Sequence, residues 1–221
     1  QRVPEPSSGF ASQVFNGGKI RNWGVEAGIG FTPIQTASML WVSRTTFTAY
    51  DSEVADLAGL PAFFPAASGF GNLGRTRVEK GKQITQIVGF GLDAQGNRNA
   101  VLSQLGNSAP SFRMGFANDF SWKRITLNAI VDWQQGGNVI NLTEYLQDDG
   151  RTSKDWGSPE WAKRYNGYLK GAISPYIEDA SFVKVREVSL NYDVPQSVTG
   201  IVRGLRTARV GVAGRNLLMF A

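Results

Sequence analysis

Residues 21–32 read RNWGVEAGIGFT, and this stretch determines how the rest of the chain is interpreted. Apolar side chains occupy every second position, and polar residues or glycine stand between them. Because successive side chains of a β-strand point to opposite faces, strict alternation predicts a strand with one apolar and one polar face. The apolar face consists of Trp23, Val25, Ala27, Ile29 and Phe31.

Five further segments alternate in the same way, at residues 38–50, 111–121, 124–135, 181–193 and 207–216. Their lengths suit a tilted membrane strand, which needs roughly 9–11 residues. The connections between the six strands run short, long, short, long and medium, a rhythm typical of the turns and loops of outer-membrane barrels. We therefore predict an all-β chain, part of an antiparallel up-and-down transmembrane β-barrel. About six strands, in three hairpins, make it an incomplete piece of a larger barrel.

The composition excludes several classes of function. The 221 residues include no cysteine and no histidine, so disulfides, thiolate metal sites and Ser-His-Asp triads are ruled out. We expect no cofactor and no enzymatic activity. No stretch approaches 18 consecutive apolar residues, so no transmembrane helix is predicted. The net charge of +5 is spread along the chain, and no nucleic-acid partner is expected.

Aromatic residues mark the expected membrane interfaces, because an amphipathic ring is stabilised at the depth of the lipid headgroups. If the short turns face the periplasm, the first, third and fifth strands run inward. Trp23 and Trp133 then lie near the outer interface. Near the inner interface lie Phe31, Trp41, Phe120, Trp122 and Tyr192.

The predicted strand at residues 181–193 fits this scheme least well. Its Lys184 and Arg186 share a face with Phe182, Val188, Leu190 and Tyr192. A charge costs about 2–4 kcal/mol at the bilayer midplane but only about 0–1 kcal/mol near an interface. Two explanations remain open: the charges meet headgroups or lipopolysaccharide phosphates at the extracellular end, or a β-bulge exchanges the two faces of the strand.

The long connections, residues 51–110 and 136–180, contain a β-like run at residues 84–90 and two helical segments at 139–147 and 159–167. Asp148, Asp149, Asp155 and Glu160 match no calcium-loop spacing, and we interpret them as a solvated loop. Five aromatic residues of the second connection are candidates for stacking on sugar rings or contacting a protein partner. Alternatively, they pack this loop against its neighbours. They are Trp156, Trp161, Tyr165, Tyr168 and Tyr176.

Four motifs, in family order along nearly the whole chain, resemble the SusC/RagA-type TonB-dependent transporters. Two resemble C-terminal barrel strands of that family: FVKVREVSLNY at residues 182–192, followed by VP, and LRTARVGVAGRNL at 205–217. GGKIRNWGVE at residues 17–26 is similar to the entry of a barrel strand, and IVDWQQGGNV at 130–139 is similar to the family pattern D-W-Q-x-G-G-x-V.

The resemblance implies a 22-stranded barrel around a plug domain in the Gram-negative outer membrane. It also implies energy from an inner-membrane TonB complex and a SusD-like surface lipoprotein as a lid. The expected substrates are oligosaccharides, peptides or similar large nutrients. Residues 1–221 are then one partial barrel domain, whose plug and final strands lie elsewhere. Its surroundings are outer-membrane lipid, lipopolysaccharide, and the rest of its own barrel and plug.

Where the family often carries a calcium-loop pattern, residues 92–98 read LDAQGNR and lack the second acidic residue, so no calcium is expected. Two other functions remain open. A SusC-like barrel can serve as a structural scaffold or anchor in a surface assembly, and a soluble β-rich binding domain would show some of the same alternation.

Overall fold

The computed structural model describes Ser7, Gly9 and residues 17–65 and 75–221, and the chain divides into two compact units. The strand unit consists of residues 24–50, 110–136 and 180–221. The loop unit consists of residues 1–23, 51–109 and 137–179.

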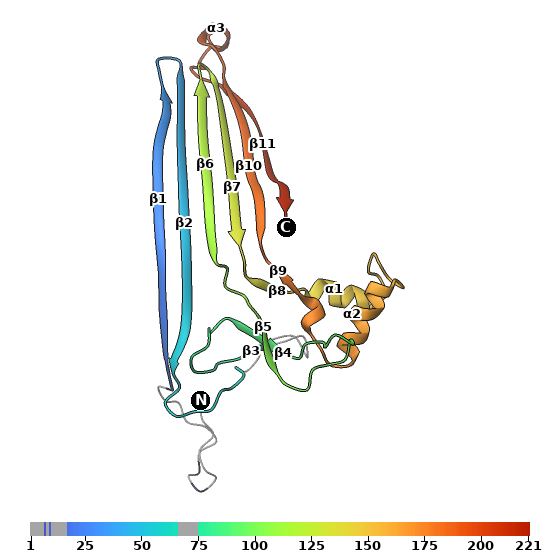
Figure 1. Cartoon of the computed structure of the whole chain (residues 1–221). Coiled ribbons are helices and arrows are strands. Elements are labelled where there is room, and N and C mark those ends of the chain that lie inside the picture. Colours follow the sequence, from blue (N-terminus) through green and yellow to red (C-terminus); the bar gives the residue numbers. More distant parts are fainter. Residues whose placement is uncertain (1–6, 8, 10–16, 66–74) are drawn as a thin grey trace. The chain divides into compact units, whose positions relative to one another are not determined.

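A six-stranded sheet forms the strand unit, in the order β1-β2-β6-β7-β10-β11 (Figure 1). The sheet is antiparallel from β2 to β11, with β1 and β11 at its two edges, so it is open. This confirms the predicted fold class of an incomplete, up-and-down barrel sheet. The strands are β1 (Lys19–Gln35), β2 (Met39–Asp56), β6 (Phe112–Trp122), β7 (Ile125–Gln135), β10 (Phe182–Asp193) and β11 (Arg209–Phe220).

Two tight turns and one longer connection join these strands into three hairpins. Between β1 and β2, the Thr36 hydroxyl accepts a hydrogen bond from the Met39 amide at 3.0 Å. Between β6 and β7, Lys123 has a left-handed φ of 53°, and its amide donates to the Ser38 carbonyl at 2.7 Å. The third connection contains the short helix α3 (Gln196–Thr199). The predicted order of short and long connections is therefore correct.

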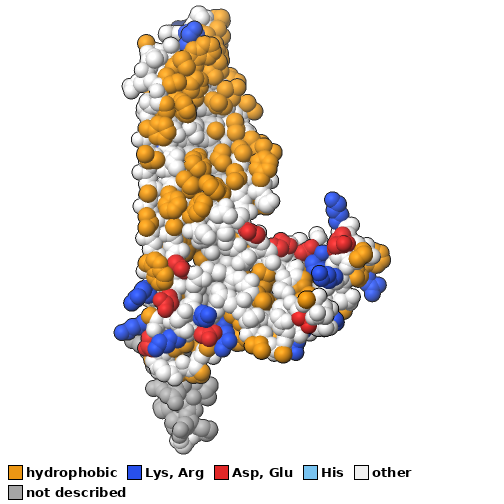
Figure 2. All heavy atoms as spheres, viewed as in Figure 1, with side chains coloured by type: hydrophobic (Ala, Val, Ile, Leu, Met, Phe, Trp, Pro, Cys, Tyr) orange, Lys and Arg blue, Asp and Glu red, His pale blue; other side chains and the backbone are white. Residues whose placement is uncertain are grey.

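The sheet carries apolar side chains on one face and polar side chains on the other, as predicted. One register row across five strands is wholly apolar: Trp41, Phe120, Leu127, Leu190 and Val212. The next row, on the opposite face, contains Asp119, Asn128 and Ser189. Figure 2 shows hydrophobic side chains gathered over the strands on the face in view.

Burial in the strand unit is the reverse of that in a water-soluble domain. Apart from Pro110 at the start of its second segment, the strand unit buries no hydrophobic side chain among the described residues. Leu190 and Val212, for example, are 47% and 70% exposed. The other residues that the strand unit buries are polar: Ser43, Gln134, Ser189 and Thr199. A sheet with this distribution requires an apolar medium outside it.

A β-bulge at Arg186 resolves the misfit in β10. The pairing of β10 with both neighbours shifts between Val185 and Glu187. Val183 and Val185 pair with Trp133 and Val131 on the apolar face, and Val188, Leu190 and Tyr192 continue that face beyond the bulge. The placement of Lys184, Arg186 and Phe182 on the apolar face was therefore wrong, because the extra residue exchanges the two faces. The bulge explanation is confirmed.

The loop unit has short strands and helices of its own. Its elements are β3 (Arg75–Thr76), β4 (Gln86–Gly89), β5 (Ser103–Asn107), β8 (Asn138–Ile140), α1 (Leu142–Asp149), α2 (Pro159–Leu169), the 3-10 helix η2 (Ser174–Tyr176) and β9 (Ile177–Asp179). The strand β4 and the helix α2 lie where the sequence predicts them, whereas the helix predicted at 139–147 begins only at Leu142, because residues 139 and 140 belong to β8. The other strands of this unit, with two to five residues each, are too short to show a period.

Local sequence explains both helix starts and the small core. The Asn141 side chain accepts from the Glu144 amide at 2.9 Å, and the Ser158 hydroxyl accepts from the Trp161 amide at 3.1 Å, so each helix has an N-cap.

The hydrophobic core of the loop unit is formed by Val54, Leu57, Ile87, Val88, Ala172, Ile173 and Tyr176. Within the described ranges, no helix is long and apolar enough to cross a membrane.

Candidate functional site

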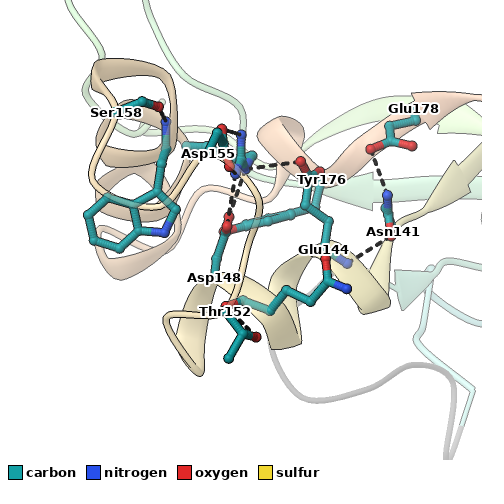
Figure 3. A network of polar contacts seen from close by, with 11 residues as sticks. Asn141, Glu144, Asp148, Thr152, Asp155, Ser158, Tyr176 and Glu178 are labelled. Atoms are coloured by element: carbon teal, nitrogen blue, oxygen red, sulfur yellow. Dashed lines mark hydrogen bonds and ion pairs between the residues drawn. The ribbon is translucent and has the colours of Figure 1, made fainter.

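A buried carboxylate, that of Asp148, lies at the centre of the second long connection. Both of its oxygens accept hydrogen bonds from Arg164, at 2.7 and 2.8 Å, and Tyr176 donates a third at 2.9 Å. Figure 3 shows Asp148, Asp155 and Tyr176 converging from three separate segments. The interpretation of this acidic run as a solvated loop was wrong for Asp148, whose side chain is fully buried.

The Arg164 guanidinium is surrounded by three carboxylates. Besides Asp148, it pairs with Asp155 at 3.0 Å and with Glu144 at 3.3 Å. Burial alone would raise the pKa of Asp148, but the hydrogen bonds it accepts, above all from Arg164, outweigh burial and lower it. Hydrogen bonds with Asp148 and Asp155 raise the pKa of Arg164. Burial, and then a hydrogen bond with Glu178, raise the pKa of Glu144.

This network holds α1, α2 and η2 together and offers no chemistry of its own. All the charges around Arg164 are paired, and the Asp148 carboxylate has no free oxygen directed at an open site. Across the described segments, no three acidic side chains form a group that could hold a metal ion. At residues 92–98, the Asp93 carboxylate accepts from the amides of Gln95 and Asn97 at 2.9 and 2.8 Å, so it closes a turn.

Three of the five predicted contact aromatics form a continuous stack along α2 and the loop before it. The rings of Trp161 and Tyr165 stack with their centroids 5.5 Å apart, and Trp156 meets Trp161 edge-on at 6.3 Å. Trp156 is 54% exposed. The indole N–H of Trp161 is buried and has no hydrogen-bond partner among the described residues. These three residues are called the aromatic platform below.

The other two, Tyr168 and Tyr176, pack against Tyr145 of α1. Tyr145 lies 4.5 Å from Tyr168 and 5.7 Å from Tyr176 between ring centroids. A hydrogen bond with Tyr168 and burial raise the pKa of Tyr145 to about 12. Tyr176 is fully buried. The sequence analysis missed Tyr145, although it lies within the helix predicted at residues 139–147.

All seven predicted interface aromatics lie in strands of the six-stranded sheet. Near the short turns, Trp41 pairs with Phe120, and one register row joins Trp122, Ile125 and Tyr192. Toward the other end of β7, Trp133 meets Phe112 edge-on at 4.9 Å. Several of these rings are about half exposed on the apolar face. Their depth in a membrane stays a prediction for Trp23, Phe31, Trp41, Phe120, Trp122, Trp133 and Tyr192.

Three arginines on the polar face of the sheet pair with carboxylates of the same face. Arg44 pairs with Asp119, and Arg186 pairs with Asp132. Arg215 and Glu187 lie 3.0 Å apart, directly opposite each other on β11 and β10. The predicted polar face is thus confirmed, and these three arginines are neutralised within the sheet, whereas Arg113 of the same face donates to the Gln134 side chain at 2.9 Å.

Comparisons with known proteins agree with this architecture. The chain matches no protein-family model. It is 26% identical to TonB-dependent receptor P3 of Formosa agariphila, over 96% of this chain and 25% of that protein. It is 23% identical to TonB-dependent receptor P26 of the same organism, over 97% of this chain and 26% of that protein. The chain therefore spans about a quarter of the length of the curated relatives it matches.

Solved structures show the same fold. The RagAB peptide importer in the open-open state superposes with a TM-score of 0.73 at 21% identity, over 100% of this chain and 27% of that chain. Its closed-closed state gives a TM-score of 0.69 at 20% identity, over 99% of this chain and 28% of that chain. Together with the receptor relatives, this fold confirms that the chain resembles, along nearly its whole length, part of the barrel of a SusC/RagA-type TonB-dependent transporter.

Proposed function

We propose that the chain is part of the outer-membrane barrel wall of a TonB-dependent transporter that imports oligosaccharides, peptides or similar large nutrients. The observation that carries this proposal is the reversed burial of the strand unit. Its hydrophobic side chains are exposed on one face, and three ion pairs lie on the other. The receptor relatives and the RagAB fold support the same assignment. We assign no enzymatic activity.

The partners follow from this assignment. The apolar face contacts outer-membrane lipid and, at one leaflet, lipopolysaccharide, with the seven interface aromatics at headgroup depth. The polar face meets the protein's own plug, and β1 and β11 continue into the rest of its barrel. TonB supplies energy from the inner membrane, and a SusD-like surface lipoprotein covers the extracellular mouth. Residues 1–221 form one partial barrel domain.

The long connection at residues 137–179 carries the proposed contact site for ligand or partner. Trp156 presents its ring to solvent, and Trp161 and Tyr165 extend it as a stacked surface. Stacking on apolar faces of sugar rings suits such a surface. Tyr168 and Tyr176 pack with Tyr145 instead, and Tyr176 is fully buried, so we assign them no direct contact with the ligand.

Deletion of the full-length gene tests the transport function. Cells lacking the protein should lose uptake of one class of oligosaccharide or peptide, and removal of the TonB complex should reproduce that loss. If uptake is intact while a surface assembly is lost, the protein is a scaffold or anchor instead. Recovery of the full-length protein in the aqueous fraction without detergent would contradict the membrane assignment.

Substitution of Trp156 tests the platform. Trp156→Ala in the full-length protein should weaken binding of the transported nutrient roughly two- to tenfold, which corresponds to the loss of one aromatic contact. Leu169→Ala, an exposed apolar change at the C-terminal end of α2, is the matched control and should leave affinity unchanged. Equal effects of both substitutions would count against a specific platform.

A further inference from the structure

The loop unit contains a cavity of about 450 Å³, and each charged residue that the structure describes in its lining is an arginine. This volume is within the range of small-molecule sites, which is roughly 300–1,000 Å³. The lining residues are Phe64, Arg75, Val88, Gly89, Phe90, Arg98, Leu102, Gly171 and Ile173. The cavity thus combines two guanidiniums with an otherwise apolar wall, and all of it belongs to one compact unit.

The backbone fixes the position of both arginines. Arg75 lies opposite Val88 in the β3–β4 pair. Arg98 follows the turn closed by Asp93 and bridges to Leu92. Two further lining residues are joined through the backbone, because the Ile173 amide donates to the Phe90 carbonyl at 2.8 Å.

Each guanidinium is also held against an aromatic ring. The Arg98 guanidinium carbon lies 4.3 Å from the centroid of Phe90, and that of Arg75 lies 5.8 Å from the centroid of Phe64. Gly171 leaves room for Arg98, because a Cβ at this position would lie 3.3 Å from the arginine Cδ. A guanidinium stacked on a ring keeps its in-plane N–H donors available for a carboxylate.

Neither arginine has a carboxylate partner among the described residues. This distinguishes them from Arg77, which pairs with Glu79 at 3.5 Å, and from the paired arginines of the sheet. Asp93, the acidic residue near Arg98 in sequence, directs one of its oxygens to two backbone amides. Both arginines are exposed, so these two positioned cations on an apolar wall are accessible to an anion from solvent.

We propose that this cavity binds a carboxylate attached to an apolar group, with Arg98 and Arg75 as the anion-binding residues and Phe64 and Leu102 as the apolar contacts. Two sources share this chemistry: the C-terminus of a peptide with an apolar last residue, and the uronate of an acidic sugar. The apolar wall favours the peptide. Failure of this binding site and failure of the transport function are distinguishable, because the site is tested by binding in detergent and transport is tested by uptake in cells.

Calorimetry on the full-length protein in detergent tests the proposal with N-acetyl-L-phenylalanine as the probe. The probe should bind measurably, its uncharged amide should bind at least fivefold more weakly, and added salt should weaken only the acid. Arg98→Gln and Arg75→Gln should each weaken binding of the acid about fivefold, because each removes charge-assisted hydrogen bonds at a partly solvated site. Arg98→Lys keeps the charge but loses the planar arrangement of N–H donors, so its affinity for the acid should be intermediate.

Lys154→Gln, an exposed cation elsewhere in the same unit, is the matched control and should bind like the unaltered protein. Unchanged proteolytic protection of the loop unit in the glutamine variants shows that they are folded. Methyl glucuronide distinguishes the two sources: if it binds more tightly than the phenylalanine probe, the carboxylate comes from a sugar. Equal binding of acid and amide, or unchanged affinity in both glutamine variants, would overturn the proposal.

Discussion

The strand unit and the loop unit place their hydrophobic side chains in opposite ways. The loop unit buries its hydrophobic residues and one charged centre, Asp148 with Arg164. The strand unit exposes its hydrophobic residues and buries a few polar ones. The difference shows that the long connections have a hydrophobic core of their own, whereas the strand unit has none. Each of the following substitutions and measurements tests this difference between the two units.

The largest effect is expected in the loop unit, from Asp148→Asn. The substitution leaves the Arg164 guanidinium with weaker compensation in a buried position, which typically costs about 3–5 kcal/mol. Because Asp155 and Glu144 remain as partners, we expect the lower end, about 3 kcal/mol. Hydrogen exchange of the α2 amides in the full-length protein measures this local stability.

The neighbouring residue gives the matched control. Asp149→Asn affects only an exposed hydrogen bond from the Tyr165 hydroxyl, of 2.7 Å, and should cost less than about 1 kcal/mol. If the two substitutions destabilise α2 equally, the buried ion pair does not hold the loop unit together.

The second effect belongs to the sheet and compares two alanines near the midpoints of adjacent strands. Ala129 lies on the apolar face, opposite Val188, and Ala117 lies on the polar face, opposite Arg44. Ala129→Arg should cost about 2–4 kcal/mol, because it places a charge near the bilayer midplane. Ala117→Arg should cost under about 1 kcal/mol, from partial repulsion by Arg44. Urea unfolding in lipid bilayers measures both, and the reverse order would mean that the faces are exchanged.

A third, smaller effect is a pH dependence confined to α1 and α2. The pKa of Asp148 is lowered in the folded state, so its stabilisation is present above about pH 4, the unfolded value, and is lost as the pH falls through the folded pKa. The pKa of Glu144 is raised, so its contribution has the opposite sign and is lost as the pH rises through its folded pKa.

Local stability should therefore rise slightly from neutral pH toward about pH 5 and fall below about pH 4. Amide exchange of α2 against pH shows this profile. In Asp148→Asn the acid-side fall should be reduced, and a fall of unchanged size would assign it to other groups.

The smallest expected effect is a change in the accessibility of spin labels along β10, which locates the bulge without a measurable change in stability. Spin labels placed singly along β10 should be most accessible to lipid-soluble oxygen at residues 183 and 185 and then at 188, 190 and 192. The pattern changes phase at Arg186, because the register shifts there with both neighbouring strands. A single uninterrupted even-numbered pattern would restore the original placement of Lys184 on the apolar face.

The strands could be predicted from sequence because each contacts two unlike environments, which imposes a two-residue period on residues such as Trp23 to Phe31. The bulge could be suspected only as one of two explanations. A single inserted residue changes the phase of the pattern but not its composition. The charged residues Lys184 and Arg186 were the signal, since they fell on the wrong face.

The loop unit was less predictable, because its short strands are defined by partners far away in the chain. Asp148 looked solvated because it stands beside another acid in a polar run, and its partner Arg164 lies 16 residues away on a different helix. The five aromatics were found from composition alone. Their division into an exposed stack and a buried cluster depends on how α2 packs on α1 and η2, which local pattern does not encode.

The bulge at Arg186 also determines where this strand can change length during evolution. Arg186 is the residue without a counterpart in the pairing of β10 with β7, so removing it leaves every other side chain on its present face. Removing a residue in the regular part of β10, such as Leu190, would turn all residues on one side of the gap to the opposite face. Single-residue gaps between related transporters should therefore be tolerated in this strand at position 186 and selected against in its regular part.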